Sequence, residues 1–442
     1  MNTENALIIQ GGRPLSGDVQ LSGSKNVALK VLIAALLVNG EVTIHNVPRI
    51  GDVAELIHLM KLLGATVDLD EHNTARIDAS TMTKSEVDLL HGSKIRVSFL
   101  LFAPLLHVFG MCRIPNPGGC RLGARSIDRI VDGLIALGAQ VTYDSETGYY
   151  DAQKSTPASG TYTFTKPSHT GTELLIMYAC RGSGEVVIKN AALEPEIDEL
   201  IVFLNHCGAR IVRQGGTITV QGVETLHQKT QYSVSADRNE AVTFAILAIA
   251  TGGSIRLRNI REEDFPAFVT AIRQTGSIVE SDENGIRFTG QGEIQPVSVT
   301  TAPHPGFMTD WQPNWAVLMT QASGESTIHE TIFENRFAYV EELQKLGADI
   351  EYYQPHVENP AQVYQFSYNP DEDYTQAIRI RGKTELHGGV LSVHDLRAGA
   401  TLLIGALIAR GESVISNIQI MDRGYESIEQ KIQALGGMIK RV

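Results

Sequence analysis

The residues best suited to chemistry in this chain form a glycine-rich loop at residues 117–125, which reads Pro-Gly-Gly-Cys-Arg-Leu-Gly-Ala-Arg. The thiol of this loop, Cys120, has Arg121 and Arg125 close by in the sequence. Glycines let backbone N–H groups approach a ligand, while guanidinium groups attract anions and activate a neighbouring thiol. The loop therefore favours a site where an anionic substrate lies beside a reactive cysteine. The alternative is a glycine-rich turn around a buried cysteine without a chemical role.

Cations elsewhere in the sequence could complete such a site. The candidates for a local basic pocket are Lys25, Arg96, Arg125, Arg336, Arg397 and Arg423. The chain as a whole carries a net charge of -13, which argues against a general nucleic-acid binder. We therefore expect small anionic substrates and no nucleic-acid partner.

Composition favours a soluble globular protein of more than one domain. The chain has 442 residues, 43% of them hydrophobic and 20% charged, and this length exceeds one ordinary hydrophobic core. The polar start lacks the pattern of a signal peptide, and no apolar run reaches the roughly 20 residues that span a bilayer. The 4 cysteines have no CxxC spacing. These features predict a cytoplasmic protein with no membrane contact and no zinc site.

Internal repeats determine how the elements should be organised. A glycine followed by an alternating apolar strand and a polar residue occurs six times, starting at Gly40, Gly110, Gly184, Gly253, Gly324 and Gly411. A second glycine signature follows each copy, at Gly64, Gly138, Gly208, Gly276, Gly347 and Gly436. The interval between Gly347 and Gly436 is the longest, so we expect an insertion there. Residues 352–376, rich in Tyr, Pro and acidic side chains, are predicted to be a solvated surface excursion.

Each repeat predicts the same elements in the same order. A helix that is apolar almost all round comes first, and such a helix is buried. These helices are predicted at 28–37, 98–106, 173–180, 241–250, 315–321 and 400–409. A short strand, an amphipathic helix such as 52–63 and a second strand such as 66–69 follow. Six such units predict an α/β protein with two domains of three units, in which buried helices lie inside sheets.

The motifs resemble those of the enolpyruvyl transferases, and the match covers nearly the whole chain. The matching segments are 22–26, 117–125, 194–197, 301–310, 333–337, 395–398 and 422–426. The resemblance implies a two-domain inside-out α/β barrel with six βαβαββ repeats, three per domain. It places residues 1–24 plus 235–442 in one domain, and residues 25–234, with the Cys120 loop, in the other. It also implies that no metal or organic cofactor is needed.

The resemblance also implies a reaction. Members with the cysteine loop transfer the enolpyruvyl group of phosphoenolpyruvate to the 3-hydroxyl of UDP-N-acetylglucosamine and release phosphate, the first committed step of peptidoglycan synthesis. They are targets of fosfomycin. Three alternatives are considered: a sibling that uses another nucleotide acceptor, a non-catalytic paralogue that binds nucleotide sugar, and the shikimate-pathway sibling. The last is disfavoured because it lacks the cysteine loop.

Roles for the reacting groups follow from the matched positions. Cys120 is implied to protonate the enol methylene or to form a covalent adduct, and the sequence does not separate these roles. Asp310 is implied to accept the proton of the sugar hydroxyl. The phosphate is assigned to Lys25, Arg125 and Arg423, and the carboxylate side to Arg336 and Arg397.

The nucleotide sugar is assigned to a further set of positions. These are Asn26, Arg96, Arg125, Ser126, Ile127, Asp128, His169, Thr170, Gly171, Ile332 and Phe333. The chain departs from the family pattern at Leu100, Ser126, Ile130 and His169, all on the nucleotide side. The reaction class is therefore better defined by the sequence than the acceptor is.

Overall fold

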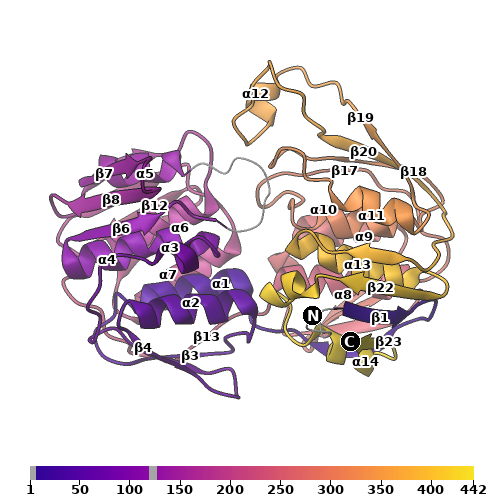
Figure 1. Cartoon of the computed structure of the whole chain (residues 1–442), viewed down its shortest axis with the longest axis horizontal. Helices are drawn as coiled ribbons and strands as arrows, with labels where there is room; N and C mark the ends of the chain where they lie inside the picture. The colour runs from indigo at the N-terminus through magenta and orange to yellow at the C-terminus, as the bar shows by residue number, and fades with distance from the viewer. Residues whose placement is uncertain (1–5, 119–126) are drawn as a thin grey trace. The chain divides into compact units, whose positions relative to one another are not determined.

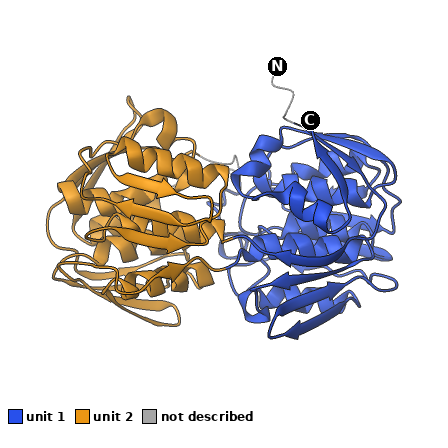
Figure 2. Cartoon of the chain, turned by 90° about the horizontal axis from the view of Figure 1, so that it is seen from below, with its two compact units in different colours: residues 1–22, 121–125, 236–442 blue, residues 23–120, 126–235 orange. Residues whose placement is uncertain are grey.

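The computed structural model describes residues 6–118 and 127–442 (Figure 1). The described chain forms two compact units, coloured separately in Figure 2. Unit 1 holds residues 6–22 and 236–442, and unit 2 holds residues 23–118 and 127–235. The chain therefore begins in unit 1, builds unit 2 and returns. The predicted site residues Cys120, Arg125 and Ser126, like Arg121, lie outside the described residues.

Unit 2 is a mixed α/β assembly with three sheets. Its helices are α1 (Lys25–Ala35), α2 (Gly51–Leu62), α3 (Leu89–Gly92), the 3-10 helix η1 (Arg96–Leu101), α4 (Phe102–Phe109), α5 (Asp128–Ala136), α6 (His169–Ala179) and α7 (Pro195–His206). Its strands are β3 (Val42–His45), β4 (Thr66–Leu69), β5 (Ala75–Asp78), β6 (Met111–Pro115), β7 (Ala139–Asp144), β8 (Tyr149–Lys154), β9 (Gly160–Thr163), β10 (Glu185–Lys189), β11 (Arg210–Gln214), β12 (Thr217–Gln221) and β13 (Tyr232–Ser233). The sheet orders are β13-β3-β5-β4, β6-β8-β7 and β11-β12-β10-β9.

Unit 1 also has three sheets. Its helices are α8 (Arg238–Ala250), η2 (Glu262–Asp264), α9 (Pro266–Gln274), α10 (Gln312–Met319), α11 (Tyr339–Lys345), α12 (Pro360–Val363), α13 (Leu396–Ile408), η3 (Ile418–Arg423) and α14 (Ile428–Ala434). Its strands are β1 (Ala6–Gln10), β2 (Ser16–Gln20), β14 (Ser254–Arg258), β15 (Ile278–Asp282), β16 (Gly285–Thr289), β17 (Val299–Thr300), β18 (Gly324–His329), β19 (Asp349–Tyr353), β20 (Ala377–Gly382), β21 (Val390–Ser392), β22 (Glu412–Ser416) and β23 (Met438–Arg441). The sheet orders are β15-β16-β14-β2, β17-β18-β20-β19 and β21-β22-β1-β23.

The sheets repeat one pairing pattern. In each four-stranded sheet, one edge strand pairs in parallel with the strand that follows a buried helix, as β17 does with β18, and the remaining neighbours are antiparallel. In the three-stranded sheet, a parallel bridge from Glu86 to Arg113 takes the place of this edge strand. In unit 1 the N-terminal strand β1 lies between β22 and β23 near the C-terminus (Figure 1). The mixed α/β architecture with repeated units is thus as the sequence predicts.

Five of the six helices predicted to be buried are observed as single helices, and the sixth, predicted at 98–106, is divided between the 3-10 helix η1 and α4. In unit 1, helices α8, α10 and α13 pack against one another, and each also packs against the strands of its own sheet. Every residue from Arg238 to Ile249 of α8 is buried. Helices α1, α6, α8, α10 and α13 start earlier than the apolar pattern predicts, because their first turns are polar. Four of these starts are capped by a side chain, that of Ser24, Ser168, Asp237 or Asp395.

The two repeat signatures are explained by backbone conformation. All six glycines of the second signature adopt a positive φ, from 82° at Gly276 to 100° at Gly208, directly after an amphipathic helix. A left-handed residue at this position closes a helix, and glycine adopts it without strain. The asparagines that end four of the strands, Asn46, Asn190, Asn259 and Asn417, are left-handed as well. The repeats therefore encode turns rather than chemistry.

The insertion differs from the predicted solvated excursion. It forms the connection between β19 and β20, and its side chains Tyr364 and Phe366 are only 5% and 7% exposed. The rings of Tyr364 and Phe366 stack with centroids 5.1 Å apart. Its acidic residues 371–373 are exposed as expected. The acidic residues predict an exposed segment, but they do not predict that the aromatic residues of the insertion are buried against unit 1.

No helix within the described ranges has both the length and the apolarity to cross a membrane.

Candidate functional site

The candidate residues lie in two groups, one in each unit, and each group is described separately. In unit 1 the centre is Asp310, which precedes α10. Arg336 donates from Nη2 to Asp310 Oδ1 at 2.8 Å, and Arg397 Nε lies 3.5 Å from Asp310 Oδ2. The side chains of Arg336 and Arg397 are 3% and 6% exposed, whereas that of Asp310 is 23% exposed. One partly accessible carboxylate is therefore held by two buried guanidinium groups.

The position of Arg397 follows from the capping of α13. Asp395 accepts hydrogen bonds from the N–H groups of Arg397 and Ala398, at 2.8 and 3.3 Å, and so fixes the first turn. Arg397 Nη1 then donates to the hydroxyl of Tyr425 at 3.3 Å. Burial disfavours the charge of Arg397, but Tyr425 and Asp310 more than offset this effect and raise its pKa. The guanidinium is thus charged and fixed in direction.

Tyr425 links this group to the core of unit 1. Its hydroxyl lies 2.9 Å from Thr243 Oγ1 on α8. Asn314 Nδ2 on α10 donates to Thr243 Oγ1 at 3.0 Å. Asn314 also accepts from Thr401 of α13 at 2.7 Å. Buried polar chains of this kind hold side chains in single orientations. The three buried helices therefore share one hydrogen-bond network that ends at Arg397.

Arg336 is held from the opposite side. Its Nη1 donates to Thr309 Oγ1 at 2.6 Å, and Thr309 donates to Glu330 Oε2 at 2.8 Å. Burial disfavours the charge of Arg336, yet Asp310 and two further carboxylates raise its pKa. Its Nε is buried and has no hydrogen-bond acceptor within the described parts of the chain. A buried donor of this kind is a position where a bound acceptor would be stabilised.

Glu330 organises the nucleotide-contact segment predicted at Ile332 and Phe333. Its Oε1 accepts from the N–H groups of both residues, at 2.7 and 3.1 Å. Glu330 is fully buried, and burial raises the pKa of its carboxyl even though Arg336 opposes the change. The guanidinium of Arg336 lies 5.3 Å from the ring centroid of Phe333. Arg423 ends η3, two residues before Tyr425, and is partly exposed.

In unit 2, Lys25 is the first residue of α1 and forms an ion pair with Asp52, its Nζ lying 2.7 Å from Asp52 Oδ2. Ser24 caps this helix, and its hydroxyl accepts from Val27 N at 3.4 Å. The two side chains are 12% and 9% exposed. Asn26 follows on α1 and is partly buried. Lys25 is thus held at the start of a buried helix, which fixes its ammonium group in place.

The other predicted contacts in unit 2 lie at helix starts. Arg96 opens η1, with its guanidinium 6.0 Å from the ring centroid of Phe99. Ile127 is buried and precedes α5, whose first residue, Asp128, is exposed. His169, Thr170 and Gly171 form the first turn of α6. Helix starts present unpaired N–H groups and favour anions, so these positions suit a phosphorylated ligand.

His169 is partly exposed and belongs to a charged cluster with the buried residues Glu173 and Lys30. Its Nε2 lies 3.2 Å from Glu173 Oε1, and Glu173 Oε2 lies 3.3 Å from Lys30 Nζ of α1. Burial lowers the pKa of His169, but the carboxylates of Glu173 and Glu194 outweigh burial and raise it above the ordinary value. The imidazole is therefore disposed to carry a charge at the start of α6.

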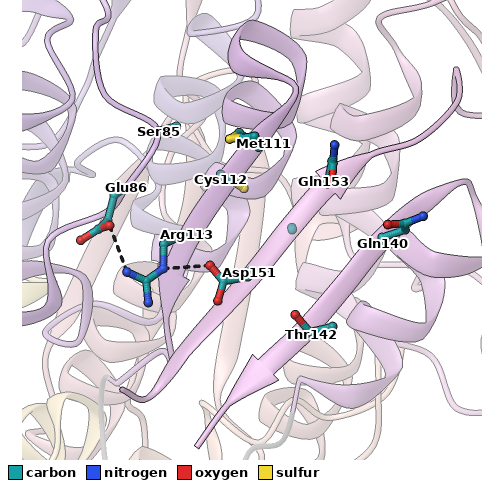
Figure 3. A pocket seen from close by; sticks show the side chains of 10 residues that line it. Ser85, Glu86, Met111, Cys112, Arg113, Gln140, Thr142, Asp151 and Gln153 are labelled. Carbon is teal, nitrogen blue, oxygen red and sulfur yellow. Dashed lines mark hydrogen bonds and ion pairs between the residues drawn. The ribbon is translucent and has the colours of Figure 1, made fainter. Parts of the chain in front are cut away.

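A pocket elsewhere in unit 2 is separate from these residues (Figure 3). It has a volume of about 360 Å³ and lies over one face of the sheet β6-β8-β7. Arg113 in this pocket forms ion pairs with Glu86 and Asp151, at 3.2 and 2.8 Å. None of the described candidate residues lines it. Because Arg113 is already paired with the carboxylates of Glu86 and Asp151, the pocket is not the candidate site.

Several residues around the site were missed by sequence reasoning. Asp52, Thr309 and Glu330 hold Lys25, Arg336 and the segment at Ile332, yet no role was predicted for any of them. A buried lysine at a helix start does imply a counter-ion, but spacing alone does not identify Asp52 among 50 acidic residues. Glu330 stood out only as the one acidic residue at the end of a repeat strand, where most copies have Asn. This departure from the repeat pattern was the one feature of the sequence that could have identified Glu330.

Comparison with known proteins identifies the family. The model of the EPSP synthase (3-phosphoshikimate 1-carboxyvinyltransferase) family matches residues 9–432. The chain therefore belongs to this family of enolpyruvyl transferases, and the resemblance in the sequence motifs is confirmed.

Full-length relatives define its relationships within the family. A UDP-N-acetylglucosamine 1-carboxyvinyltransferase from Desulforapulum autotrophicum is 40% identical, covering 98% of this chain and 99% of the relative. Enzymes of the same name from Desulfatibacillum aliphaticivorans and Trichlorobacter lovleyi are 39% and 40% identical, each with 99% coverage of both chains.

Solved structures agree on the fold. The enolpyruvyl transferase NikO from Streptomyces tendae is 23% identical with a TM-score of 0.85, covering 99% of each chain. An EPSP synthase from Acinetobacter baumannii is 16% identical with a TM-score of 0.71 over 99% of each chain. At these identities the likeness concerns the fold alone.

Proposed function

We propose that this protein transfers the enolpyruvyl group of phosphoenolpyruvate to the 3-hydroxyl of UDP-N-acetylglucosamine and releases phosphate, the first committed step of peptidoglycan synthesis. The observation that carries the proposal is the carboxylate of Asp310, held by Arg336 and Arg397. It occurs in a chain about 40% identical over its full length to enzymes named for this reaction.

The proposed chemistry has two steps. In the first, the sugar hydroxyl attacks the enol carbon, Asp310 accepts its proton, and the methylene carbon gains a proton to give a tetrahedral intermediate. In the second, phosphate leaves, a proton is lost from the new methyl group, and the double bond returns. The guanidinium groups of Arg336 and Arg397 hold the Asp310 carboxylate in a fixed direction for the first step.

The remaining candidates are proposed to bind and orient the substrates. Lys25, Arg125 and Arg423 take the phosphate, and Arg336 and Arg397 take the carboxylate side of phosphoenolpyruvate. Cys120 supplies the proton for the methylene or forms the covalent adduct. The nucleotide sugar is assigned to the set Asn26, Arg96, Arg125, Ser126, Ile127, Asp128, His169, Thr170, Gly171, Ile332 and Phe333. No metal or organic cofactor takes part in this scheme.

We further propose that units 1 and 2 are the two domains, each an inside-out α/β barrel. The central packing of α8, α10 and α13, each with its own sheet, supports this reading for unit 1. The cytoplasm is the proposed location, because Cys112, Cys180 and Cys207 are free thiols and suit a reducing compartment. Nucleic acid is not a proposed partner, since the net charge is -13.

The proposal is tested by product analysis. Purified protein is mixed with phosphoenolpyruvate and UDP-N-acetylglucosamine, and the nucleotide is examined by mass spectrometry while phosphate is assayed. We expect a nucleotide sugar that carries one added enolpyruvyl group for each phosphate released. Omission of either substrate should abolish both signals. Phosphate release without a heavier nucleotide would show hydrolysis instead and would contradict the transfer.

A further inference from the structure

The insertion is not needed to build its sheet. Strands β19 and β20 form an antiparallel hairpin whose last pair is Tyr353 and Ala377. The corresponding hairpins in two other repeats end at Gln214 with Thr217 and at Asp282 with Gly285, so two-residue connections suffice there. Residues 354–376 therefore extend a connection that the fold can close with a short turn. Their presence requires a separate reason.

The insertion is ordered by its own aromatic side chains. Tyr364 contacts Tyr368 with centroids 5.6 Å apart, and Tyr374 contacts both Phe366 and Tyr368, at 5.1 and 5.5 Å. Tyr364 also meets the ring of His329, at the end of β18, edge to face at 5.8 Å. Packed rings in this arrangement make a small satellite core. An insertion ordered in this way can hold the residues that it contacts in fixed positions.

The hydrogen bonds of the insertion fall next to the contact with His329, on the loop of residues 330–335 that follows β18. Gln376 Nε2 donates to the carbonyls of Glu330 and Phe333, at 2.7 and 3.1 Å, and Gln376 Oε1 accepts from Asn335 N at 2.9 Å. Asn335 in turn accepts from Thr375 N at 2.7 Å. Gln376 is only 1% exposed. One buried side chain thus satisfies three backbone groups of a loop that has no regular structure.

A second anchor comes from the aromatic part of the insertion. The N–H of Gln365 donates to the carbonyl of Thr331 at 2.8 Å, and the N–H of Glu330 donates to the carbonyl of Gln376 at the same distance. The loop is therefore bound to the insertion at both of its ends. Within the loop, the Glu330 carboxylate accepts hydrogen bonds from the N–H groups of Ile332 and Phe333, as described above. The loop carries Ile332 and Phe333 and leads directly to Arg336.

We propose that residues 354–376 act as a brace that positions the loop 330–335, and Arg336 directly after it, for binding of the nucleotide sugar, with Gln376 as the main positioning residue. The brace fixes the backbone of Ile332 and Phe333 and the direction of Arg336 towards Asp310. The proposal rests on the proposed function, because that function assigns these two residues to the nucleotide. Its role is in positioning, and Gln376 takes no part in the chemistry.

Two variants test the brace. Gln376→Met keeps the length of the side chain but removes all three hydrogen bonds, and replacement of 354–376 by Asn-Gly closes the hairpin with a short turn. The control is Gln354→Ala, because Gln354 is exposed and its side chain donates to the carbonyl of Tyr374 within the insertion. Each variant is assayed for KM of both substrates, for kcat, and for binding of UDP-N-acetylglucosamine by calorimetry.

The brace variants are expected to change KM and Kd for the nucleotide sugar more than they change kcat. Both brace variants should raise KM and Kd for UDP-N-acetylglucosamine by about tenfold, as expected when one or two buried hydrogen bonds are lost, with a smaller change in kcat. Gln354→Ala should match the wild type. Unchanged KM and Kd in both brace variants, beside an active wild type, would overturn the brace. An inactive wild type would instead overturn the proposed function.

A measurement on the wild type covers the case in which the variants do not fold. Backbone hydrogen exchange should show that the amides of Glu330, Asn335 and Gln365 are protected like those of β20, because each donates a hydrogen bond that joins the loop to the insertion. Rapid exchange of these three amides would contradict the brace without reference to any variant.

Discussion

Asp310 illustrates how one carboxylate can be both held and available. Its partners Arg336 and Arg397 are almost fully buried, whereas Asp310 itself is 23% exposed. Because each guanidinium is fixed by a further partner, Thr309 or Tyr425, the carboxylate has little freedom to rotate. A general base needs this combination of fixed direction and access to the proton that it accepts.

Replacement of Asp310, the proposed base, should separate binding from turnover. Asp310→Asn keeps the shape of the side chain, but an amide cannot accept the proton of the sugar hydroxyl. We expect turnover to fall by at least ~100-fold, the lower range for general base catalysis, with little change in Kd for UDP-N-acetylglucosamine. Steady-state phosphate release and calorimetry measure the two effects. Near-normal phosphate release would remove Asp310 from the mechanism.

Labelling by a phosphonate epoxide such as fosfomycin should occur at one cysteine only. The other three cysteines are buried, and burial raises the pKa of Cys180 and Cys207 to about 12 and that of Cys112 further still. A buried neutral thiol is a poor nucleophile. We expect a single adduct on Cys120, faster in the presence of nucleotide sugar, and none on Cys120→Asp. Peptide mass spectrometry that finds equal labelling of the variant would refute this.

At the level of single residues, the sequence predicted the charges better than their partners. Arg336, Arg397 and Asp310 were each assigned a role from a motif, and the structure places them in contact. Asp52, Thr309 and Glu330 could not be predicted in the same way, because they act through contacts between segments far apart in the chain. The separation of Lys30 and Glu173, which form a buried ion pair, shows the same limit.

At the level of elements, the first turns of the buried helices carry several of the proposed site residues. Lys25 begins α1, His169 begins α6 and Arg397 is the second residue of α13. The apolar patterns predicted where these helices run but placed several starts too late, because a capped first turn is polar. Polar side chains at the start of an otherwise apolar helix therefore indicate a capped first turn, and it is at such turns that we propose the substrates bind.

The charged cluster at α6 should give stability a distinct dependence on pH. The pKa of His169 is raised in the folded state by Glu173 and Glu194, against burial and the opposing charge of Lys30. The folded protein therefore binds this proton more tightly than the unfolded chain does. Its contribution is complete below about pH 6.5, the unfolded value, and is lost as pH rises through the folded pKa.

This dependence can be measured by urea unfolding between about pH 6 and pH 9, the range around and above the ordinary histidine pKa. The free energy of unfolding of the wild type should decline over that range more steeply than that of His169→Gln. The control is His72→Gln, since His72 is 82% exposed. Identical slopes for the wild type and His169→Gln would show that the cluster does not hold the proton.

At the level of the whole molecule, the chain ends complete unit 1. β1 pairs with β22 and β23 and buries Leu7 and Ile9 at 1% and 0% exposure. The repeats predicted six units, and the described residues form six sheets. The repeat pattern could not show that β1 is a central strand of the last sheet, because pairing between segments far apart in the chain produces no local sequence pattern.

Removal of residues 1–10 should therefore unfold unit 1 more readily than unit 2. A central strand with two neighbours would be lost, together with its buried side chains. Both tryptophans, Trp311 and Trp315, are buried in unit 1, so their fluorescence reports on this unit alone. We expect a red-shifted emission while part of the far-UV circular dichroism signal remains. Native emission from the truncated chain would show that β1 is dispensable.

The acceptor is the point on which the whole account depends, because the departures at Leu100, Ser126, Ile130 and His169 fall on the nucleotide side. The most direct measurement is phosphate release from phosphoenolpyruvate with UDP-N-acetylglucosamine, UDP-glucose and UMP in parallel. We predict turnover with UDP-N-acetylglucosamine and little or none with the other two. Turnover of UMP but not of UDP-N-acetylglucosamine would assign the protein to a sibling activity. Binding of UDP-N-acetylglucosamine without phosphate release from any mixture would make it a non-catalytic paralogue, and either result would contradict the account.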